Sequence, residues 1–468
     1  MVLAAGVALA AIAPSAQGQT YRPRETPQRA QVVEAYGGLY EGAVASYVAQ
    51  VGDRVAAAAG RAPGQCAFGV INSDVINAFA APPSCSVYIT RGLLSILNSE
   101  DELASVLGHE VGHVAANHAG RRQNRSALSG IGALLVGALT RSPELGQLAG
   151  QAAQLNILSY SRSQELEADS LGIRYLEANG YAPYALADML DSLQANDQLD
   201  ARARGREEAQ ATPAWGRTHP LTSERIARAA QQARQTAEGV AEREAPFLSA
   251  IDGMLYGDDP RQGFVNGRNF THPDLGLAFT APPGFALRNG PQSVKIEGPG
   301  GVSGQFGAGR AQGGRLDGYA YDVMQRLLGQ TSSQVGQAEM TRINGLDAVI
   351  LPARAQTQRG TVDVTVAAYS LGSDAAYHFV TLAPAGRGGV FEPLFGSFRR
   401  LSAGEATSVR PRRLEVVTVR PGDTVNSLAS RMAVSDFGLE RFRVLNGLAP
   451  GEPLRPGQRV KLVTTGRR

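Results

Sequence analysis

The first 250 residues carry mostly helical patterns of apolar positions. Valine, leucine and tyrosine recur at helical spacing through 24–60, so we expect one long helix there. A second helix is expected over 99–119, because Ser99 and Glu102 have the spacing of a capping box and Gly120 can end a helix. Three more helices are predicted at 161–179, 183–194 and 222–243. This half of the chain is therefore predicted to be mainly α-helical.

After residue 250 the pattern changes to short strand-like runs separated by turns. The stretch 249–269 is rich in glycine and aspartate, which indicates a linker. Strand-like and turn-like segments then alternate over 270–402, with one helix near 315–329, which favours an α+β accessory domain. The strand candidates are 275–280, 347–355, 361–371 and 376–382. A second linker, 403–413, leads to a small final module, 414–464.

The composition is that of a folded, multidomain protein. A length of 468 residues predicts two to four domains of ~100–200 residues each. Hydrophobic residues make up 43% of the chain and charged residues 19%, which excludes a disordered chain. The net charge is only +3 and no long basic run occurs, so nucleic acid binding has no electrostatic support.

The N-terminal 19 residues have the pattern of a secretory signal peptide, although no Lys or Arg precedes the apolar run. Val2 to Ala13 are apolar and uncharged, and the small residues Ala16 and Gly18 suit a cleavage site. Twelve apolar residues are too few to span the ~30 Å hydrocarbon core of a membrane. We therefore expect residues 1–19 to be removed on export to the periplasm or cell exterior, and no transmembrane helix in the mature chain.

The two cysteines carry information about both the fold and the compartment. Two thiols are too few for a disulfide-dense scaffold or a multi-cysteine zinc or iron–sulfur site. Cys66 and Cys85 lie in a segment, 66–91, that is predicted to form two short strands around a turn. An oxidising compartment favours a cross-strand disulfide between them, and two buried free thiols are the alternative.

The sequence HEVGH, inside the helix predicted over 99–119, carries the strongest chemical signal. His109 and His113 are i,i+4 neighbours on one helix face, so they can bind one metal ion together. Glu110 lies ~100° around the helix axis, where it can reach a metal-bound water without ligating the metal. Zinc suits two imidazoles, a carboxylate and a water, and the glutamate would act as general base. The pattern predicts a zinc peptidase, and two helical histidines on a polar face are the alternative.

The third protein ligand is expected in SRSQELEADSLG, within the helix predicted over 161–179. Glu165 and Asp169 are i,i+4 and share a face, whereas Glu167 lies ~200° from Glu165 and should point away. We assign Glu165 to the metal and keep Glu167 as the alternative ligand. Asp169 is expected to accept the ring N–H of a ligand histidine and so fix its tautomer.

These motifs resemble the zinc metallopeptidase family of HtpX, Oma and the CAAX prenyl proteases, and within it the soluble periplasmic BepA-like branch. HEVGH at His109–His113 and ELEAD at Glu165–Asp169 carry the resemblance, which covers roughly residues 25–245. Further matches are NAF at Asn77–Phe79, YITRGLL at Tyr88–Leu94, DELASVLGHE at Asp101–Glu110 and THPLTSERI at Thr218–Ile226. The resemblance implies a zincin-type (gluzincin) domain, mainly helical with a small β element, expected over 20–248. It also implies that Glu165 is the third ligand. AAPPSC replaces the glycine-rich turn usual after NAF, which leaves the shape of the cleft open.

Three further residues of this domain have open roles. In BepA-like relatives a histidine at the position of His219 can bind the zinc, which implies a self-inhibited resting state because an imidazole as fourth ligand closes a tetrahedral site. The alternatives for His219 are binding of the tetrahedral oxyanion and a plain turn position before Pro220. Arg225 either steadies a carboxylate or substrate carbonyl or forms a surface salt bridge. His118 lies ~140° off the face of His113 and is not expected to be a ligand.

The remaining segments have less specific patterns. The apolar stretch 127–139 lies between the two zinc-binding helices, where it is either a mobile lid that contacts substrate or a buried core helix. The accessory domain contains no cluster of titratable residues and only weakly resembles PsbP-like domains, so His272 and His378 are expected to be structural. Residues 414–464 resemble a LysM module with the order strand, helix, helix, strand. LysM modules bind glycans that contain N-acetylglucosamine, such as peptidoglycan; a role in packing alone is the alternative.

Together these features predict an exported, zinc-dependent endopeptidase with one Zn²⁺ per chain. Its expected substrates are unfolded or misassembled envelope proteins, and its expected further partner is a peptidoglycan glycan. A chaperone-like or wall-tethered binding protein with a closed zinc site is the alternative. A cell-wall hydrolase is disfavoured because only the LysM-like module points to it.

Overall fold

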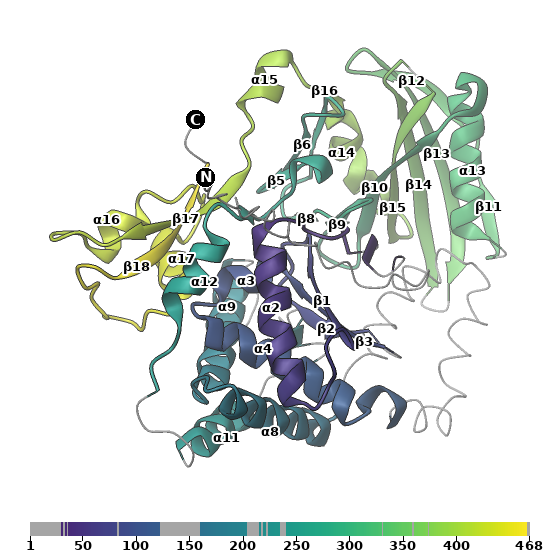
Figure 1. Ribbon diagram of the computed structural model, residues 1–468. Helices are drawn as coiled ribbons and strands as arrows, with labels where there is room; N and C mark the ends of the chain where they lie inside the picture. Colours follow the sequence, from purple (N-terminus) through teal and green to yellow (C-terminus); the bar gives the residue numbers. More distant parts are fainter. Residues whose placement is uncertain are drawn as a thin grey trace, which may run out of the picture.

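The computed structural model shows a helical part, a large sheet domain and a small C-terminal module (Figure 1). It describes residues 30–465 apart from 31–32, 35, 82–83, 122–159, 204–214, 217–218, 221–222, 235–239, 330, 358–359 and 373. The predicted signal peptide, 1–19, and the apolar stretch 127–139 lie outside the described residues. No helix in the described part of the chain is long and apolar enough to cross a membrane.

The first described long helix is shorter than the sequence pattern predicts. Helix α2 spans Ala43–Ala58, and the prediction of one helix over 24–60 is wrong across its middle. Gly37, Gly38 and Gly42 have φ values of 108°, 81° and 107°, a region that glycine adopts far more easily than other residues. These backbone angles interrupt the helix, and α2 begins only after the last of them.

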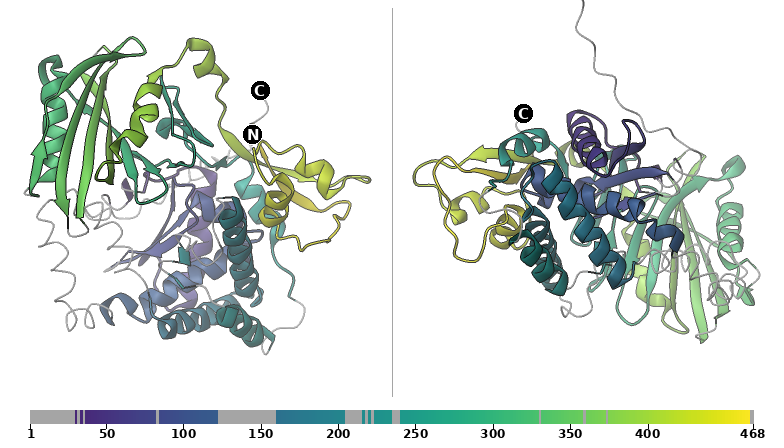
Figure 2. Two further views of the ribbon diagram at one scale, coloured as in Figure 1. Left: turned by 180° about the vertical axis from the view of Figure 1, so that it is seen from behind. Right: turned by 60° about the horizontal axis from the view of Figure 1, so that its bottom comes forward.

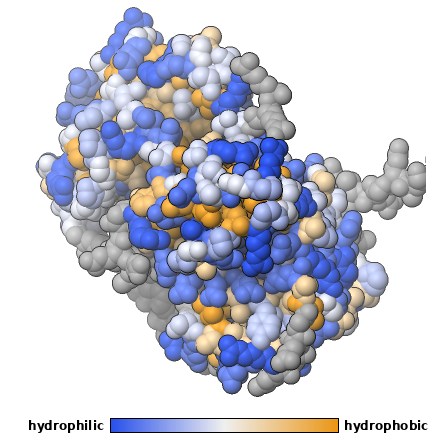
Figure 3. All heavy atoms as spheres, turned by 90° about the vertical axis from the view of Figure 1, so that its left-hand side faces the viewer, coloured by the Kyte–Doolittle hydropathy of each residue, from blue (hydrophilic) through white to orange (hydrophobic). Residues whose placement is uncertain are grey.

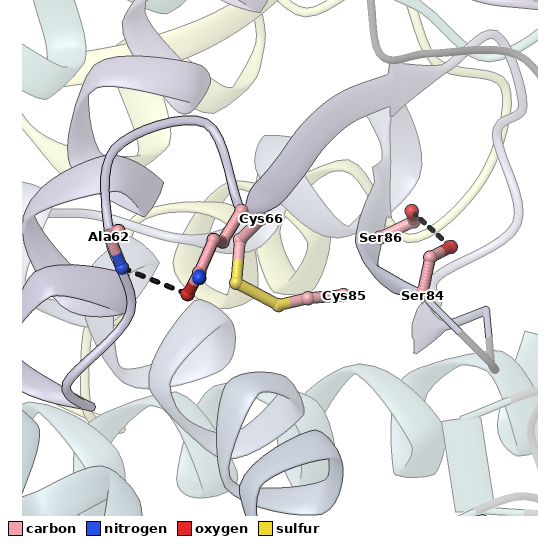
Figure 4. The surroundings of a disulfide bond; sticks show 6 residues. Ala62, Cys66, Ser84, Cys85 and Ser86 are labelled. Carbon is pink, nitrogen blue, oxygen red and sulfur yellow. Dashed lines mark hydrogen bonds between the residues drawn. A yellow bond between two sulfur atoms is a disulfide. The ribbon is translucent and has the colours of Figure 1, made fainter.

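A small three-stranded sheet follows α2 and holds the disulfide bond. Its strand order is β1-β3-β2, with β1 (Cys66–Ile71) parallel to β3 (Cys85–Thr90) and β2 (Ala78–Ala80) antiparallel to β3. The expected pair of strands around a turn is therefore wrong, because β2 lies between β1 and β3 in the sequence and β1 pairs with β3 in parallel. The parallel register places Cys66 opposite Cys85, and their sulfurs form a disulfide (Figure 4). The predicted disulfide is confirmed.

Two closely packed helices lie at the centre of the helical part. These are α4 (Glu100–Ala115), which carries HEVGH, and α8 (Arg162–Ala178), which carries ELEAD. A Cβ atom added at Gly112 would lie 3.1 Å from a backbone oxygen of α8, and one at Gly172 would lie 3.3 Å from the His109 nitrogen. Glycine therefore lets the two backbones approach closely enough for their side chains to form one site. The neighbouring helices are α3 (Arg91–Ile96), α9 (Ala185–Ala203, longer than predicted), α11 (Ser223–Arg234) and α12 (Glu244–Ile251).

The accessory part is built from two antiparallel sheets. The eight-stranded sheet has the order β11-β13-β14-β15-β10-β9-β8, with β12 also on β13, and α13 (Leu316–Leu328) packs on its face (Figures 1 and 2). The four-stranded sheet has the order β16-β7-β6-β5 and shares with it a core that includes Phe279, Phe306 and Phe379. The strands of the first sheet are β8 (Ala286–Arg288), β9 (Val294–Glu297), β10 (Ser303–Arg310), β11 (Ser333–Val335), β12 (Glu339–Ile343), β13 (Leu346–Thr357), β14 (Gly360–Ser370) and β15 (Ala375–Pro384). The second comprises β5 (Phe264–Asn266), β6 (Asn269–His272), β7 (Leu277–Thr280) and β16 (Arg399–Arg400), beside α14 (Glu392–Ser397).

Both segments predicted as linkers contain regular structure. The stretch 249–269 contributes β4 (Leu255–Tyr256) to a sheet with the C-terminal module and β5 to the four-stranded sheet. The stretch 403–413 contains α15 (Ala403–Ser408) and the start of β17. Besides joining the domains covalently, strands in these segments form backbone hydrogen bonds with the neighbouring sheets.

The C-terminal module has the predicted order of elements. They are β17 (Arg412–Thr418), α16 (Val425–Ala429), α17 (Gly438–Leu445) and β18 (Arg459–Thr464). Strand β17 lies between β18 and β4, antiparallel to both. Figure 3 faces the end of the molecule that carries this module, where apolar residues gather in the middle of a mostly hydrophilic surface. Phe437 and Leu439, near the start of α17, are among the exposed apolar residues.

The module packs against the helical part and shares its core. One apolar cluster contains Leu414, Phe442 and Leu462 of the module together with residues of α2, α4 and α9. The buried Lys461 Nζ on β18 donates hydrogen bonds to the carbonyl oxygens of Ser95, at 2.9 Å, and Leu97. Burial lowers the pKa of Lys461 to about 7. The module is thus joined to the segment that leads directly into α4.

Candidate metal centre

Two imidazoles of α4 converge on one point, as their spacing predicts. The Nε2 atoms of His109 and His113 lie 3.0 Å apart, and both side chains are buried. The helix that presents them starts at Ser99, whose hydroxyl accepts the N–H of Glu102 at 2.9 Å, as expected for a helix cap. The N-terminus of the helix that carries both histidines is therefore fixed by a side-chain cap.

Helix α8 brings a carboxylate to the same point. The Glu165 carboxylate lies 3.6 Å from His109 Nε2 and 3.5 Å from His113 Nε2. One turn further along the helix, Asp169 Oδ1 lies 2.9 Å from His109 Nδ1 and holds the ring by the nitrogen that faces away from Glu165. An ionised carboxylate only accepts hydrogen bonds, so His109 Nδ1 carries the proton and Nε2 presents its lone pair.

Arg225 of α11 fixes both carboxylates of α8. Its Nη1 lies 2.7 Å from Glu165, and its Nε and Nη2 donate to the two oxygens of Asp169 at 2.8 Å each. The guanidinium is buried, so these ion pairs form in a region of low dielectric. Of the alternatives left open by the sequence, the structure shows Arg225 steadying a carboxylate and excludes a surface salt bridge.

His219 completes the cluster from a different segment. Its Nδ1 lies 3.2 Å from Glu165 and 3.3 Å from His109 Nε2, and its Nε2 lies 3.4 Å from Glu110. The ring of Trp215 stacks on it with centroids 4.3 Å apart. One ligand atom from each of four residues lies within 4.8 Å of the others, namely His109, His113, Glu165 and His219.

Glu110 lies beside this cluster, and its environment fits a metal site. Both of its carboxylate oxygens are buried and have no hydrogen-bond partner among the described residues. A buried, unpaired carboxylate is costly unless a positive charge or a polar ligand compensates it. Two imidazole nitrogens and a carboxylate, with an unpaired glutamate beside them, form the donor set that zinc prefers.

Two pKa shifts of the cluster favour the protonation states that bind metal. For His109, burial lowers the pKa, but the hydrogen bond to Asp169 and the charge of Glu165 outweigh burial and raise the pKa above its ordinary value. Burial, together with the neighbouring His109, lowers the pKa of His113 well below its ordinary value, so the ring is neutral. Burial alone would raise the pKa of Glu165, but the nearby imidazoles of His219 and His113 hold it well below its ordinary value. Burial likewise opposes ionisation of Asp169, while Arg225 and His109 lower its pKa.

His118 lies outside the cluster, as predicted, but its contact with His113 was not predicted. Its buried ring contacts the far side of His113, with the two Nδ1 atoms 2.7 Å apart. Glu167, considered above as an alternative ligand, points away from the cluster toward His118 and is 46% exposed. The helical angle calculation for His118 assumed an unbroken helix. Helix α4 ends at Ala115, and Asn117 adopts φ 51°, which redirects the chain.

Comparison with known proteins agrees with this arrangement. Residues 43–233 match the profile of peptidase family M48, a span that contains every residue of the candidate metal centre. Residues 43–233 belong to peptidase family M48. The family assignment in the sequence analysis is thereby confirmed, as is the C-terminal module, because residues 417–463 match the LysM domain.

Several curated relatives of the M48 domain are proteases. The beta-barrel assembly-enhancing protease of Yersinia pestis is 32% identical over 208 residues, which cover 42% of this chain and 40% of the relative. The protein of the same name from Escherichia coli K12 is 29% identical over 239 residues, 49% of this chain and 46% of the relative. The mitochondrial metalloendopeptidase OMA1 of Arabidopsis thaliana is 33% identical over 124 residues, 26% and 25% of the two chains. The chain thus spans less than half the length of these relatives.

Solved structures add little about the accessory domain. The solution structure of cyanobacterial PsbP from Synechocystis covers 31% of this chain and 98% of that protein, at 14% identity and a TM-score of 0.24. This score is too low to assign a fold, so the weak resemblance to PsbP-like domains stays a prediction.

Proposed function

We propose that the protein is an exported zinc metalloendopeptidase. The observation that carries the proposal is the convergence of His109, His113 and Glu165 beside the unpaired carboxylate of Glu110. In this assignment the first three residues hold one zinc ion, and Asp169 orients His109 from behind. The match of this region to family M48 supports the same assignment.

The chemistry follows from the positions of the side chains. Bound zinc would lower the pKa of a water molecule and polarise the scissile carbonyl. Glu110 accepts the proton of the attacking water and then delivers it to the leaving amine. Its carboxylate can do both because it is held next to the cluster without a hydrogen bond that would fix its proton.

His219 is proposed to inhibit the resting enzyme. It lies among the three proposed ligands, where its imidazole would be a fourth ligand and would take the position that water needs. It also lies 3.4 Å from Glu110, so it occupies the space between the ligands and the general base. An active state then requires the segment of Trp215 and His219 to move away from the cluster.

The variant His219→Ala tests this inhibition directly. We expect the rate of cleavage of an unfolded protein such as casein to increase on the order of tenfold. This factor corresponds to about 1.4 kcal/mol of free energy by which His219 stabilises the closed site. The measurement is the initial rate at equal zinc content for the wild type and the variant. A loss of activity with zinc retained would instead assign His219 to the tetrahedral oxyanion.

The proposed substrates are unfolded or misassembled envelope proteins, with the periplasm as the proposed location. The names of the relatives support this class of substrate, and the disulfide, a bond that persists in oxidising compartments, supports the location. The proposed second partner is a peptidoglycan glycan, since LysM is the domain found at the C-terminus. Retention of the full chain on peptidoglycan sacculi, compared with its retention on cellulose, would test whether the module binds the glycan.

A binding protein with a closed zinc site is the second candidate, favoured by the position of His219 inside the cluster. Such a protein would suppress the aggregation of an unfolded client equally well as wild type and as Glu110→Gln. The peptidase instead requires Glu110, so its loss of proteolysis in that variant separates the two functions.

A further inference from the structure

The ring of His113 is held by a chain of three side chains that lead to the surface. His118 Nδ1 lies 2.7 Å from His113 Nδ1, and His118 Nε2 lies 3.2 Å from Glu167 Oε2. Arg121 Nη2 in turn donates to the same Glu167 oxygen at 3.0 Å. These residues come from the end of the α4 segment and from α8, so the chain also joins the two helices that supply the metal ligands.

The protons of this chain can be assigned from its chemistry. A carboxylate only accepts hydrogen bonds, so His118 Nε2 must be the donor to Glu167. In the neutral imidazole the other nitrogen, His118 Nδ1, is then an acceptor. The short contact between the two Nδ1 atoms therefore requires His113 Nδ1 to carry a proton. That proton leaves His113 Nε2 with its lone pair directed at the cluster.

The local backbone positions His118 for this contact. Asn117 adopts a left-handed conformation, which asparagine tolerates better than most residues and which turns His118 back toward His113. The amide of Gln164, at the start of α8, donates to the backbone oxygen of His118 at 3.1 Å. The ring of Tyr160 stacks on the face of His113 with centroids 3.8 Å apart.

We propose that His118, oriented by Glu167, is a positioning residue that fixes the metal-binding tautomer and the ring orientation of His113. The inference rests on the proposed zinc site. His118 would accept the Nδ1 proton of His113 just as Asp169 accepts the Nδ1 proton of His109, with a neutral imidazole in place of a carboxylate as the acceptor. Glu167, the middle glutamate of ELEAD, thereby has a role in the site although it is not a proposed metal ligand.

The test is the zinc affinity of the full chain, measured by competition with a chromophoric chelator. Removing the acceptor in His118→Ala should weaken zinc binding by about 10- to 100-fold, the range typical for partners that orient a metal ligand. In His118→Gln the amide oxygen can still accept from His113 and the amide nitrogen can still donate to Glu167, so most of the affinity should return. Such a rescue would not occur if the ring acted only by filling space.

A second pair of variants avoids the buried position. Glu167→Ala should weaken zinc binding by a smaller factor, whereas Glu177→Ala should leave it unchanged. Glu177 is the matched control, because it is an exposed glutamate of the same helix about three turns further on. The melting temperature of the metal-free chains reports any loss of folding separately from the loss of metal.

The inference is overturned if His118→Ala binds zinc as tightly as the wild type, or if His118→Gln binds as weakly as His118→Ala. Zinc affinity is read without proteolysis, so the result is separate from the proposed activity. Wild-type and His219→Ala chains that both bind zinc but cleave nothing would end the proposed peptidase function and leave the role of His118 intact.

Discussion

Glu110→Gln is expected to abolish proteolysis while one zinc ion stays bound. Glutamine has nearly the same shape but cannot take a proton from water, so the rate should fall by about 10²- to 10⁴-fold. None of the three proposed ligands changes, and zinc content should remain one per chain. The measurement is the initial rate of casein cleavage together with zinc content, on the wild type and the variant at the same protein concentration.

The same substitution should not destabilise the fold. Both oxygens of Glu110 are buried without a hydrogen-bond partner among the described residues, and His219 Nε2 lies 3.4 Å away, so the wild type carries much of the cost of a buried carboxylate. We expect the metal-free Glu110→Gln chain to melt at the wild-type temperature or above it. Glu177→Gln, the same change on an exposed surface, is the control and should alter neither quantity. Retained activity in Glu110→Gln would show that Glu110 is not the general base.

Deleting residues 412–468 is expected to unfold the peptidase part, because the LysM module belongs to its core. The deletion removes β17 from its pairing with β4 and exposes the apolar surfaces that α9 and α12 bury against the module. It also removes Lys461, the hydrogen-bond donor to the carbonyl oxygens just before α4. We expect an insoluble chain or one that has lost its cooperative thermal transition, observed by circular dichroism.

A single substitution gives a milder form of the same test. Phe442 on α17 is fully buried in the shared cluster, so Phe442→Ala should cost about 3–5 kcal/mol and lower the melting temperature of the peptidase part by roughly 6–20 °C. Leu439→Ala, on the exposed side of the same helix, is the matched control and should change it little. If the chain that lacks residues 412–468 has the melting temperature and activity of the wild type, the module is only tethered to the peptidase part and does not stabilise it.

The sequence predicted that side chains of the candidate metal centre lie together, because their geometry is local. His109 with His113, and Glu165 with Asp169, each lie one helical turn apart, so the angle between them follows from the helix alone. Arg225 and His219 come from elsewhere in the chain. Their place in the cluster depends on how α11 and the Trp215 segment pack, and spacing alone left their roles open.

Other features depended on contacts that periodicity does not encode. His118 lies outside the metal cluster, as predicted, but its contact with His113 was not foreseen, because α4 ends before it and Asn117 takes a left-handed conformation. The parallel pairing of β1 with β3 needs a crossover that a strand pattern cannot distinguish from a hairpin. The two predicted linkers have the composition of loops, yet β4 and β17 pair across more than 150 residues of sequence.

Titration of zinc into the metal-free full chain, with casein cleavage measured at each step, tests the central claim most directly. We predict that activity rises in proportion to bound zinc, reaches its plateau at one zinc per chain, and is faster throughout for His219→Ala. Binding of one zinc ion without cleavage in either chain would contradict the account and establish the site as one that binds metal without proteolysis.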